Sequence, residues 1–344
     1  MIYFNNDYCE GCHPKILEKL QQTNYVQTAG YGMDEFCRQA ADHIRRHCGS
    51  QDLDVHFLVG GTQANMTVID AALRPHQGAL CAVSGHINVH ETGAVEATGH
   101  KVLALPSDDG KITARQVREY VTAHRNDPDA EHTVQPKLVY ISNPTELGAL
   151  YSLAELTALA DTCHELGLYL FLDGARLGYG LAARGNDVTL PDLARLCDVF
   201  YIGGTKCGAL MGEAVVLVND DLKENFRSYI KQNGGMLAKG WLLGLQFATL
   251  FEEGLYFSIT KQAVRDAMRI RDAFRERGIP FHMESPTNQQ FVVLDERQME
   301  TLGAKHIFEY IAPAGEGRHC VRFCTSWSTL PEDVEALIKD ITDL

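Results

Sequence analysis

Between residues 54 and 219 the sequence alternates short, almost continuously apolar runs with segments whose apolar residues recur at helical spacing. Strands that are apolar along their whole length are typical of a mostly parallel sheet buried on both faces by helices. Helices are predicted at residues 62–72 and 153–166. Seven strands are predicted, at residues 55–59, 79–83, 101–105, 138–142, 168–172, 199–202 and 214–218.

The pattern changes after residue 219. Long helical stretches are predicted, then two strand-like segments and a last helix beginning at Glu332, which indicates a smaller α+β domain. A chain of 344 residues is long enough for two domains. We therefore expect a large α/β domain over residues 1–240 and a small one over 241–344. The helical stretches of this second part are residues 223–231, 237–252 and 261–277, and its strands are 289–294 and 320–324.

Composition excludes several classes of partner. The net charge is −14 and no basic cluster is present, which argues against nucleic acids and anionic membranes. The sequence contains no run of about 18 consecutive apolar residues, so no membrane-spanning helix is predicted. Cys9 and Cys12 form one tight pair among ten cysteines, whereas a structural zinc site needs two such pairs, so we expect no metal. Residues 1–7 lack the features of a secretory signal, and we expect a cytoplasmic enzyme with reduced thiols.

Two predicted strands end in residues with distinctive chemistry. Residues 170–172 are followed by Asp173, and residues 199–202 by Gly203, Gly204, Thr205 and Lys206. Lys206 follows Asp173 by 33 positions, which leaves room for one crossover helix and a return strand. Many pyridoxal-phosphate enzymes hold their cofactor with such a pair, because the carboxylate keeps the pyridine nitrogen protonated and the amine forms a Schiff base with the aldehyde. Alternatively, Asp173 caps a helix and Lys206 is a surface lysine.

A phosphate site is predicted where the first strand meets its helix. Gly60 and Gly61 end the strand and Thr62 lies near the helix N-cap, where free N–H groups and the helix dipole attract anions. Thr205 is expected to donate its hydroxyl to the same phosphate. The alternative is an ordinary strand-to-helix turn.

His86 and His90 follow the second predicted strand and are four residues apart, which is compatible with zinc binding on one helical face. No third ligand stands out, and the order differs from the H-E-x-x-H motif. In a second interpretation His86 lies on the pyridine ring, with His90 and Glu91 behind it. In a third, His86 is merely structural.

Two arginines are predicted to bind anions. Arg176 follows Asp173 closely and is expected to point towards the cofactor or the substrate. Arg322 interrupts an apolar strand, and a buried guanidinium needs an anionic partner. An amino-acid carboxylate held at two points would provide it, although a structural salt bridge remains an alternative.

In order and spacing these motifs resemble the threonine aldolase family, in the β-eliminating-lyase group of pyridoxal-phosphate enzymes. The resemblance spans nearly the whole chain and implies the aspartate-aminotransferase-like fold, known as fold type I. The matching stretches are residues 6–14, 60–65, 85–93, 144–148, 172–177, 203–206 and 322–327.

The resemblance also implies roles for single residues. Lys206 matches the Schiff-base lysine, Asp173 the partner of the pyridine nitrogen, and His86 the histidine stacked on the ring. Asn6 stands where the family typically has a serine that contacts the substrate carboxylate. His132 is expected to match a second active-site histidine. The remaining matches are Gly61 and Thr62 to the phosphate-binding turn, and Arg176 and Arg322 to arginines near the cofactor and the carboxylate.

The implied reaction is the cleavage of a β-hydroxy-α-amino acid, such as threonine, allo-threonine or phenylserine, to glycine and an aldehyde. His86, His132 and an ordered water are the candidates for the base. A β-eliminating lyase acting on an aromatic or sulfur amino acid is the alternative enzyme, and a non-catalytic interaction protein is a remote one. The resemblance further implies a homotetramer of two dimers, with residues 25–31 and 231–239 near the dimer interface.

Overall fold

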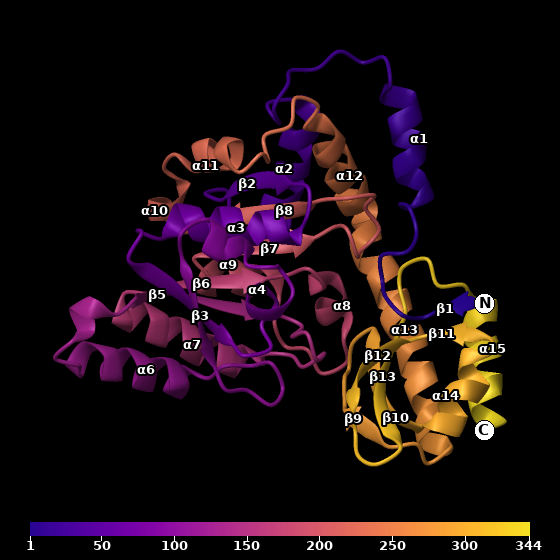
Figure 1. The fold of residues 1–344 in the computed structure, drawn as a ribbon. Coiled ribbons are helices and arrows are strands. Elements are labelled where there is room, and N and C mark those ends of the chain that lie inside the picture. Colours follow the sequence, from indigo (N-terminus) through magenta and orange to yellow (C-terminus); the bar gives the residue numbers. More distant parts are fainter.

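The computed structural model describes all residues from 1 to 344, and its large domain is built on one seven-stranded sheet (Figure 1). The strand order is β2-β8-β7-β6-β5-β3-β4. β8 is antiparallel to both of its neighbours, and the other pairings are parallel. The predicted mostly parallel sheet of seven strands is confirmed. Its strands are β2 (Asp54–Leu58), β3 (Gln77–Ala82), β4 (Lys101–Leu105), β5 (Gln135–Ser142), β6 (Tyr169–Asp173), β7 (Val199–Gly203) and β8 (Glu213–Leu217).

Helices cover both faces of this sheet and create two hydrophobic cores. Successive strand residues point to opposite faces, so Phe200 and Ile202 of β7 enter one core while Val199 and Tyr201 enter the other. The first core includes α1 (Pro14–Thr23), α2 (Glu35–Cys48), α6 (Ala114–Asn126), α7 (Leu153–Leu166), α8 (Leu177–Ala182), α9 (Leu190–Leu196) and α12 (Trp241–Phe251). The second includes α3 (Gly61–Ala72), α4 (His86–Val89), α5 (Ala94–Ala97), α10 (Asp220–Lys223) and α11 (Phe226–Gln232).

The small domain is an antiparallel sheet with the strand order β12-β13-β10-β9, packed against long helices. The N-terminal strand β1 (Ile2–Tyr3) pairs with β11 (His306–Ile307), and Phe4 is buried in the small-domain core. Both chain ends therefore lie at this domain (Figure 1). Its other elements are α13 (Leu255–Glu276), β9 (Phe281–Met283), β10 (Gln289–Asp295), α14 (Glu296–Gly303), β12 (Glu309–Pro313), β13 (Arg318–Cys324) and α15 (Pro331–Thr342), and short 3-10 helices occur at η1 (Ala130–His132) and η2 (Glu252–Gly254).

The helix predicted at residues 223–231 is two short helices in the structure, α10 and α11. The break falls at Asn225, which adopts a left-handed backbone conformation with φ 59°. Asparagine tolerates this conformation better than most residues because its short amide group bonds locally. The prediction of one continuous helix is wrong for that reason.

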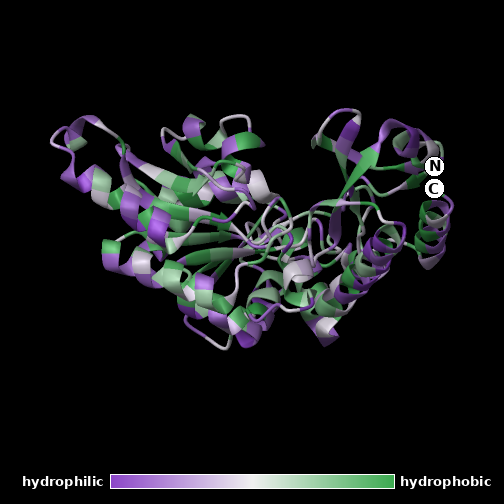
Figure 2. Ribbon diagram, turned by 90° about the horizontal axis from the view of Figure 1, so that it is seen from below, coloured by the Kyte–Doolittle hydropathy of each residue, from purple (hydrophilic) through white to green (hydrophobic).

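Helix α13 connects the two domains. Its first turns, with Tyr256 and Val264, pack in the core of the large domain, and its last turns, with Ile270 and Phe274, pack in the small-domain core. We propose that the division between the domains lies within α13, because α12 packs on the large domain. Hydrophobic residues line the central strands, and the outer sides of the helices are more hydrophilic (Figure 2). None of the helices has the length and apolarity that a membrane crossing requires.

Candidate active site

A cavity of about 210 Å³ lies where β5, β6 and β7 end, together with the turn that follows β2. Clefts at the carboxyl ends of strands are the usual ligand sites of open α/β sheets. Seven of the nine predicted site residues line this cavity, and the other two, Asn6 and Arg322, do not. The lining residues are Val59, Gly60, Gly61, Thr62, His86, Ser142, Pro144, Glu146, Asp173, Ala175, Arg176, Tyr201, Thr205, Lys206, Met211 and Glu213.

Two glycines let the ends of β6 and β7 touch. The N–H of Gly203 donates to the carbonyl oxygen of Gly174 over 2.9 Å. A Cβ atom on Gly174 would lie 1.9 Å from the carbonyl oxygen of Tyr201, and one on Gly203 would lie 2.3 Å from that of Ala175. Only glycine permits this approach of two backbones. It brings the residues that follow the two strands into the same cavity.

Asp173 ends β6 and is held by three donors. Its Oδ1 accepts from the N–H of Ala175 over 2.9 Å, and its Oδ2 accepts from Asn65 Nδ2 over 3.1 Å and from Tyr140 Oη over 2.5 Å. The carboxylate is buried, and no Lys, Arg or His nitrogen lies within 4 Å of it. The structure thus fixes a carboxyl group that forms no ion pair within 4 Å.

Lys206 lies at the end of β7 and lines the same cavity. Its backbone carbonyl accepts a hydrogen bond of 2.5 Å from Tyr179 Oη, and its amine lies 5.9 Å from the centre of the Tyr8 ring. Burial, and next the positive charge of Arg176, lower the pKa of the Lys206 amine. A lysine with a lowered pKa is more often neutral and therefore more nucleophilic.

The N-terminus of α3 opens into the cavity. Gly60 is its N-cap and provides no side-chain bond, so the first N–H groups of the helix remain free for a ligand. The buried hydroxyl of Tyr201 has no hydrogen-bond partner, and a Cβ on Gly61 would lie 3.1 Å from it. Free N–H groups and an unpaired hydroxyl suit an oxygen-rich anion such as a phosphate. Thr62 and Thr205 line this part of the cavity.

His86 begins α4 and is bound to an acid. Its Nδ1 lies 2.7 Å from Glu91 Oε1, which also accepts from Asn65 Nδ2 over 2.7 Å. Burial lowers the pKa of His86, but the Glu91 hydrogen bond and the charges of Asp173 and Glu91 outweigh it, so the net change is upward. The His90 ring is 5.6 Å from that of His86. No group of three or more His, Cys, Asp or Glu side chains is arranged to hold a metal.

Arg176 is bound to an acid that the sequence did not single out. Its Nε and Nη2 donate to the two oxygens of Asp7 over 2.8 and 3.0 Å, which is a two-point ion pair. Asp7 is fully buried and also accepts from Asn288 Nδ2 over 2.9 Å. Burial raises the pKa of Asp7, but Arg176 and Lys206 prevail and lower it to about 2. Asp7 thereby joins the N-terminal segment, the large domain and the small domain.

Arg322 of β13 has no carboxylate within 4 Å, so the alternative of a structural salt bridge is wrong. Its Nη2 donates to the carbonyl of Asn5 over 2.8 Å and its Nη1 to Gln289 Oε1 over 3.2 Å, while its buried Nε has no partner. Asn6 follows Asn5 directly, and its Oδ1 accepts from the N–H of Tyr8 over 3.0 Å. The charge of Arg322 is therefore not neutralised within the chain.

His132 lies at the wrong edge of the sheet. It belongs to η1, which precedes β5, whereas the cavity lies where β5 ends. Its side chain is 73% exposed and its nearest acid is the neighbouring Glu131, 4.0 Å away. The prediction of His132 as a second active-site histidine is wrong, because a residue before a strand and the residues after it lie about one strand length apart.

Two acids of the cavity, and the links between Asp173 and His86 behind it, were assigned no role from the sequence. Glu146 follows β5, Glu213 begins β8, and Asn65 and Glu91 connect Asp173 to His86. Burial raises the pKa of Glu213 to about 8, and its Oε2 accepts from the N–H of Gly204 over 3.1 Å. An acid within an otherwise apolar strand was the available signal for Glu213. Glu146 lies in the matching stretch 144–148, but the sequence analysis assigned it no role.

Comparisons with known proteins agree with this geometry. A family model described as "Beta-eliminating lyase" matches residues 11–297. Proteins described as low specificity L-threonine aldolase are 30% identical to the chain in Pseudomonas sp. over 343 residues and in Pseudomonas aeruginosa over 341; each match covers 98% of this chain and 96% of the relative.

Solved structures give the same result. The Leishmania major threonine aldolase is 42% identical, with a TM-score of 0.97 over 100% of this chain and 99% of that one. An aspartate aminotransferase from Thermus thermophilus matches 100% of this chain and 91% of its own with a TM-score of 0.72, at 16% identity, and so compares in fold alone. The aspartate-aminotransferase-like fold predicted from the sequence is confirmed.

The buried Asp7–Arg176 pair predicts a pH-dependent contribution to stability. A carboxylate whose pKa is lowered stabilises the folded state above its ordinary pKa of 3.8, and this contribution is lost as pH falls towards about 2. We expect Asp7→Asn to lower the free energy of unfolding by about 2 kcal/mol at neutral pH, from about 1.4 kcal/mol per pKa unit. The difference from the wild type should shrink below pH 3.8.

Urea unfolding of both proteins at several pH values measures this effect. The exposed Asp161 has no hydrogen bond or ion pair, so Asp161→Asn provides the matched control. A difference for Asp7→Asn that stays constant from neutral to acidic pH would contradict the assigned electrostatic role.

Proposed function

The chain belongs to the threonine aldolase family of β-eliminating lyases, and from this premise we propose that it cleaves a β-hydroxy-α-amino acid to glycine and an aldehyde with pyridoxal 5'-phosphate as cofactor. One observation carries the proposal, namely that an amine of lowered pKa and an unpaired carboxylate share one cavity with a free helix N-terminus. Threonine, allo-threonine and phenylserine are the proposed substrates.

The residues of the cavity fit the cofactor. Lys206 would hold its aldehyde carbon and Asp173 its ring nitrogen, while His86 would cover the ring. The N-terminus of α3, with Tyr201 and Thr205, would bind the phosphate. When bound, pyridoxal phosphate supplies a ring that accepts the electron pair of the breaking bond.

Three hydrogen bonds orient the carboxylate of Asp173, which would pair with the protonated ring nitrogen. Asn65 joins Asp173 to Glu91, and Glu91 fixes the His86 ring through Nδ1. The side chains beneath and beside the ring are thus oriented by one connected set of hydrogen bonds.

The substrate carboxylate is proposed to bind Arg322, with Asn6 and Arg176 nearby. Arg322 has no carboxylate partner in the chain, whereas Arg176 already binds Asp7. A two-point grip on the carboxylate fixes rotation about the amino acid Cα, so that the Cα–Cβ bond is the one presented for cleavage.

We also propose a homotetramer built from two dimers, in a cytoplasmic location. Several apolar side chains near residues 25–33 are exposed, including Tyr25 at 94% and Met33 at 67%. Large exposed apolar groups that lie together indicate a contact surface. Nine of the ten cysteines are buried free thiols, which is typical of proteins from reducing compartments.

The first test is the Lys206→Ala variant. Without the amine it should lose the visible absorbance of bound pyridoxal phosphate and lose cleavage of threonine and phenylserine, measured as glycine and aldehyde. Lys261→Ala, at an exposed position without an ion pair, should behave like the wild type. Pyruvate and ammonia as the wild-type products from tyrosine, tryptophan or cysteine would instead identify a β-eliminating lyase.

Arg322→Ala tests the carboxylate site. Loss of a charge-assisted hydrogen bond of about 1.5–3 kcal/mol should lower kcat/KM roughly 10- to 100-fold for every substrate, while the affinity for pyridoxal phosphate is retained. Arg322→Lys should restore little, because an ammonium group lacks the planar two-point geometry. Arg318→Ala alters an exposed arginine of the same strand and is the control. Equal losses of cofactor and substrate affinity would point to a structural arginine instead.

The oligomer is tested by light scattering of the wild type and of Met33→Asp. A charge placed in a buried contact should shift the tetramer towards smaller species and reduce activity. Tyr310→Asp, at a half-exposed position in the small domain, is the control and should leave the mass unchanged. A fully active wild-type monomer at micromolar concentration would refute the proposal.

A further inference from the structure

We propose that Glu146 is the catalytic base that removes the proton of the substrate β-hydroxyl during cleavage. This inference rests on the proposed function and assigns a step whose acceptor the sequence left open among His86, His132 and water. Glu146 stands in the loop that follows β5 and lines the same cavity as Lys206 and Asp173.

The Glu146 carboxylate is anchored on one side and free on the other. Its Oε1 accepts from the backbone N–H of His86 over 2.9 Å and from Ser142 Oγ over 2.7 Å. Its Oε2 makes no hydrogen bond within the chain, and the residue lines the cavity. One oxygen thus fixes the group while the other can accept a proton from a ligand.

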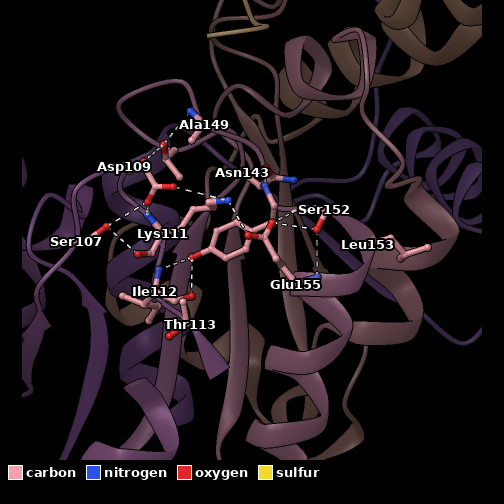
Figure 3. A network of polar contacts seen from close by, with 12 residues as sticks. Ser107, Asp109, Lys111, Ile112, Thr113, Asn143, Ala149, Ser152, Leu153 and Glu155 are labelled. Carbon is pink, nitrogen blue, oxygen red and sulfur yellow. Dashed lines mark hydrogen bonds and ion pairs between the residues drawn. The ribbon is translucent and has the colours of Figure 1, made fainter. Parts of the chain in front are cut away.

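The loop that carries Glu146 is held firmly on both sides. Thr145 Oγ1 donates to the carbonyl of Asp109 over 2.8 Å, and Asn143 Oδ1 accepts from the N–H of Tyr151 over 3.1 Å. Tyr151 Oη in turn accepts from the N–H of Ile112 over 2.8 Å. Figure 3 shows this network between residues 107–113 and the segment that begins at Asn143. A catalytic base must be held in a fixed position relative to the proton that it removes, and a rigid loop provides this.

The electrostatic environment of Glu146 favours its action as a base. Burial, and also the charge of Asp173, raise the pKa of Glu146, although its hydrogen bonds oppose this change. A carboxylate with a raised pKa is a stronger proton acceptor near neutral pH. No cation pairs with it within 4 Å. The titratable groups that face Glu146 or the loop around it are Cys81, His86, Glu91, Tyr140, Tyr151 and Asp173.

The histidines are less suitable. The Nδ1 of His86 is already bound to Glu91 Oε1 over 2.7 Å, and this hydrogen bond contributes to the raised pKa of the ring, so His86 is held in place by Glu91. His132 is exposed at the other edge of the sheet. His90 does not line the cavity.

In the proposed step, Glu146 takes the proton of the substrate β-hydroxyl. The β-hydroxyl O–H bond breaks, its proton goes to Glu146 Oε2, and its electron pair forms the new carbonyl bond of the aldehyde. The Cα–Cβ bond breaks at the same time, and pyridoxal phosphate, when bound, would supply the acceptor for its electron pair. In the reverse, synthetic direction, the protonated Glu146 returns the proton to the aldehyde oxygen.

Glu146→Gln isolates the proton transfer, because an amide oxygen still accepts from His86 and Ser142 but is not a base. We expect cleavage of threonine and phenylserine to fall by roughly 10²- to 10⁴-fold, the usual contribution of a general base. Exchange of the glycine Cα hydrogen with solvent deuterium involves no β-hydroxyl and should be retained, as should the affinity for pyridoxal phosphate. Glu165→Gln, at an exposed residue of α7, is the matched control.

Several outcomes separate the alternatives. Equal losses of cleavage and exchange in Glu146→Gln would overturn the proposal, because a merely structural residue affects both reactions. Glu146→Asp keeps the charge but withdraws it by one methylene group, and a selective, smaller loss of cleavage should result. A wild-type protein that exchanges glycine but cleaves no β-hydroxy amino acid would refute the proposed function itself rather than this assignment.

A second measurement uses the cofactor-free protein. An acid whose pKa is raised by folding lowers stability as pH rises between its ordinary and its raised value, because it ionises first in the unfolded chain. The wild type should therefore lose stability relative to Glu146→Gln as pH rises from acidic values. The resulting difference in Tm should level off by neutral pH. A difference that never changes, or never levels off, would contradict an ionised base at neutral pH.

Discussion

The active site depends on the contact between two backbones at Gly174 and Gly203. Their hydrogen bond of 2.9 Å leaves no room for a Cβ atom on either residue. Because the strands β6 and β7 are parallel neighbours, their carboxyl ends already lie at one edge of the sheet. The close approach then brings Asp173 and Lys206, which are 33 residues apart in sequence, into the lining of one cavity.

A second constraint is the concentration of acids at this edge. Asp7, Glu91, Glu146, Asp173 and Glu213 surround only a few basic groups, and each buried carboxylate must be held by donors to remain in the fold. The solutions differ. Asp7 receives a two-point ion pair and its pKa is lowered, whereas Glu213 receives a backbone N–H and its pKa is raised to about 8. Burial and partners therefore shift the pKa values of two carboxyl groups in opposite directions within one site.

Most of the fold could be predicted from the sequence because its signals are local. The seven strands are mostly apolar, and α7 has both a capping box at Ser152 and a left-handed Gly167 at its end. Asp173, Lys206 and the α3 turn follow such strands directly, so their positions follow from the topology. Asp7 and Glu146 lie in irregular segments, and their burial depends on contacts with residues distant in sequence, which periodicity does not report. The prediction for His132 was wrong because it used only the proximity of this residue to β5. Proximity in sequence does not tell which end of the strand lies at the site.

The unsatisfied groups of the site connect its stability to its ligands. Tyr201 Oη and Arg322 Nε are buried without partners, and Lys206 has no ion pair. Each buried polar group left unpaired costs the folded state about 1–3 kcal/mol. These costs are tolerated because the surrounding cores of the two domains are extensive and because Asp7 joins three segments at this point. In the proposed function, a phosphate at the N-terminus of α3 and a carboxylate at Arg322 would supply the missing partners. The same unpaired atoms that weaken the free protein would then contribute to ligand binding, because a ligand that pairs with them removes their cost.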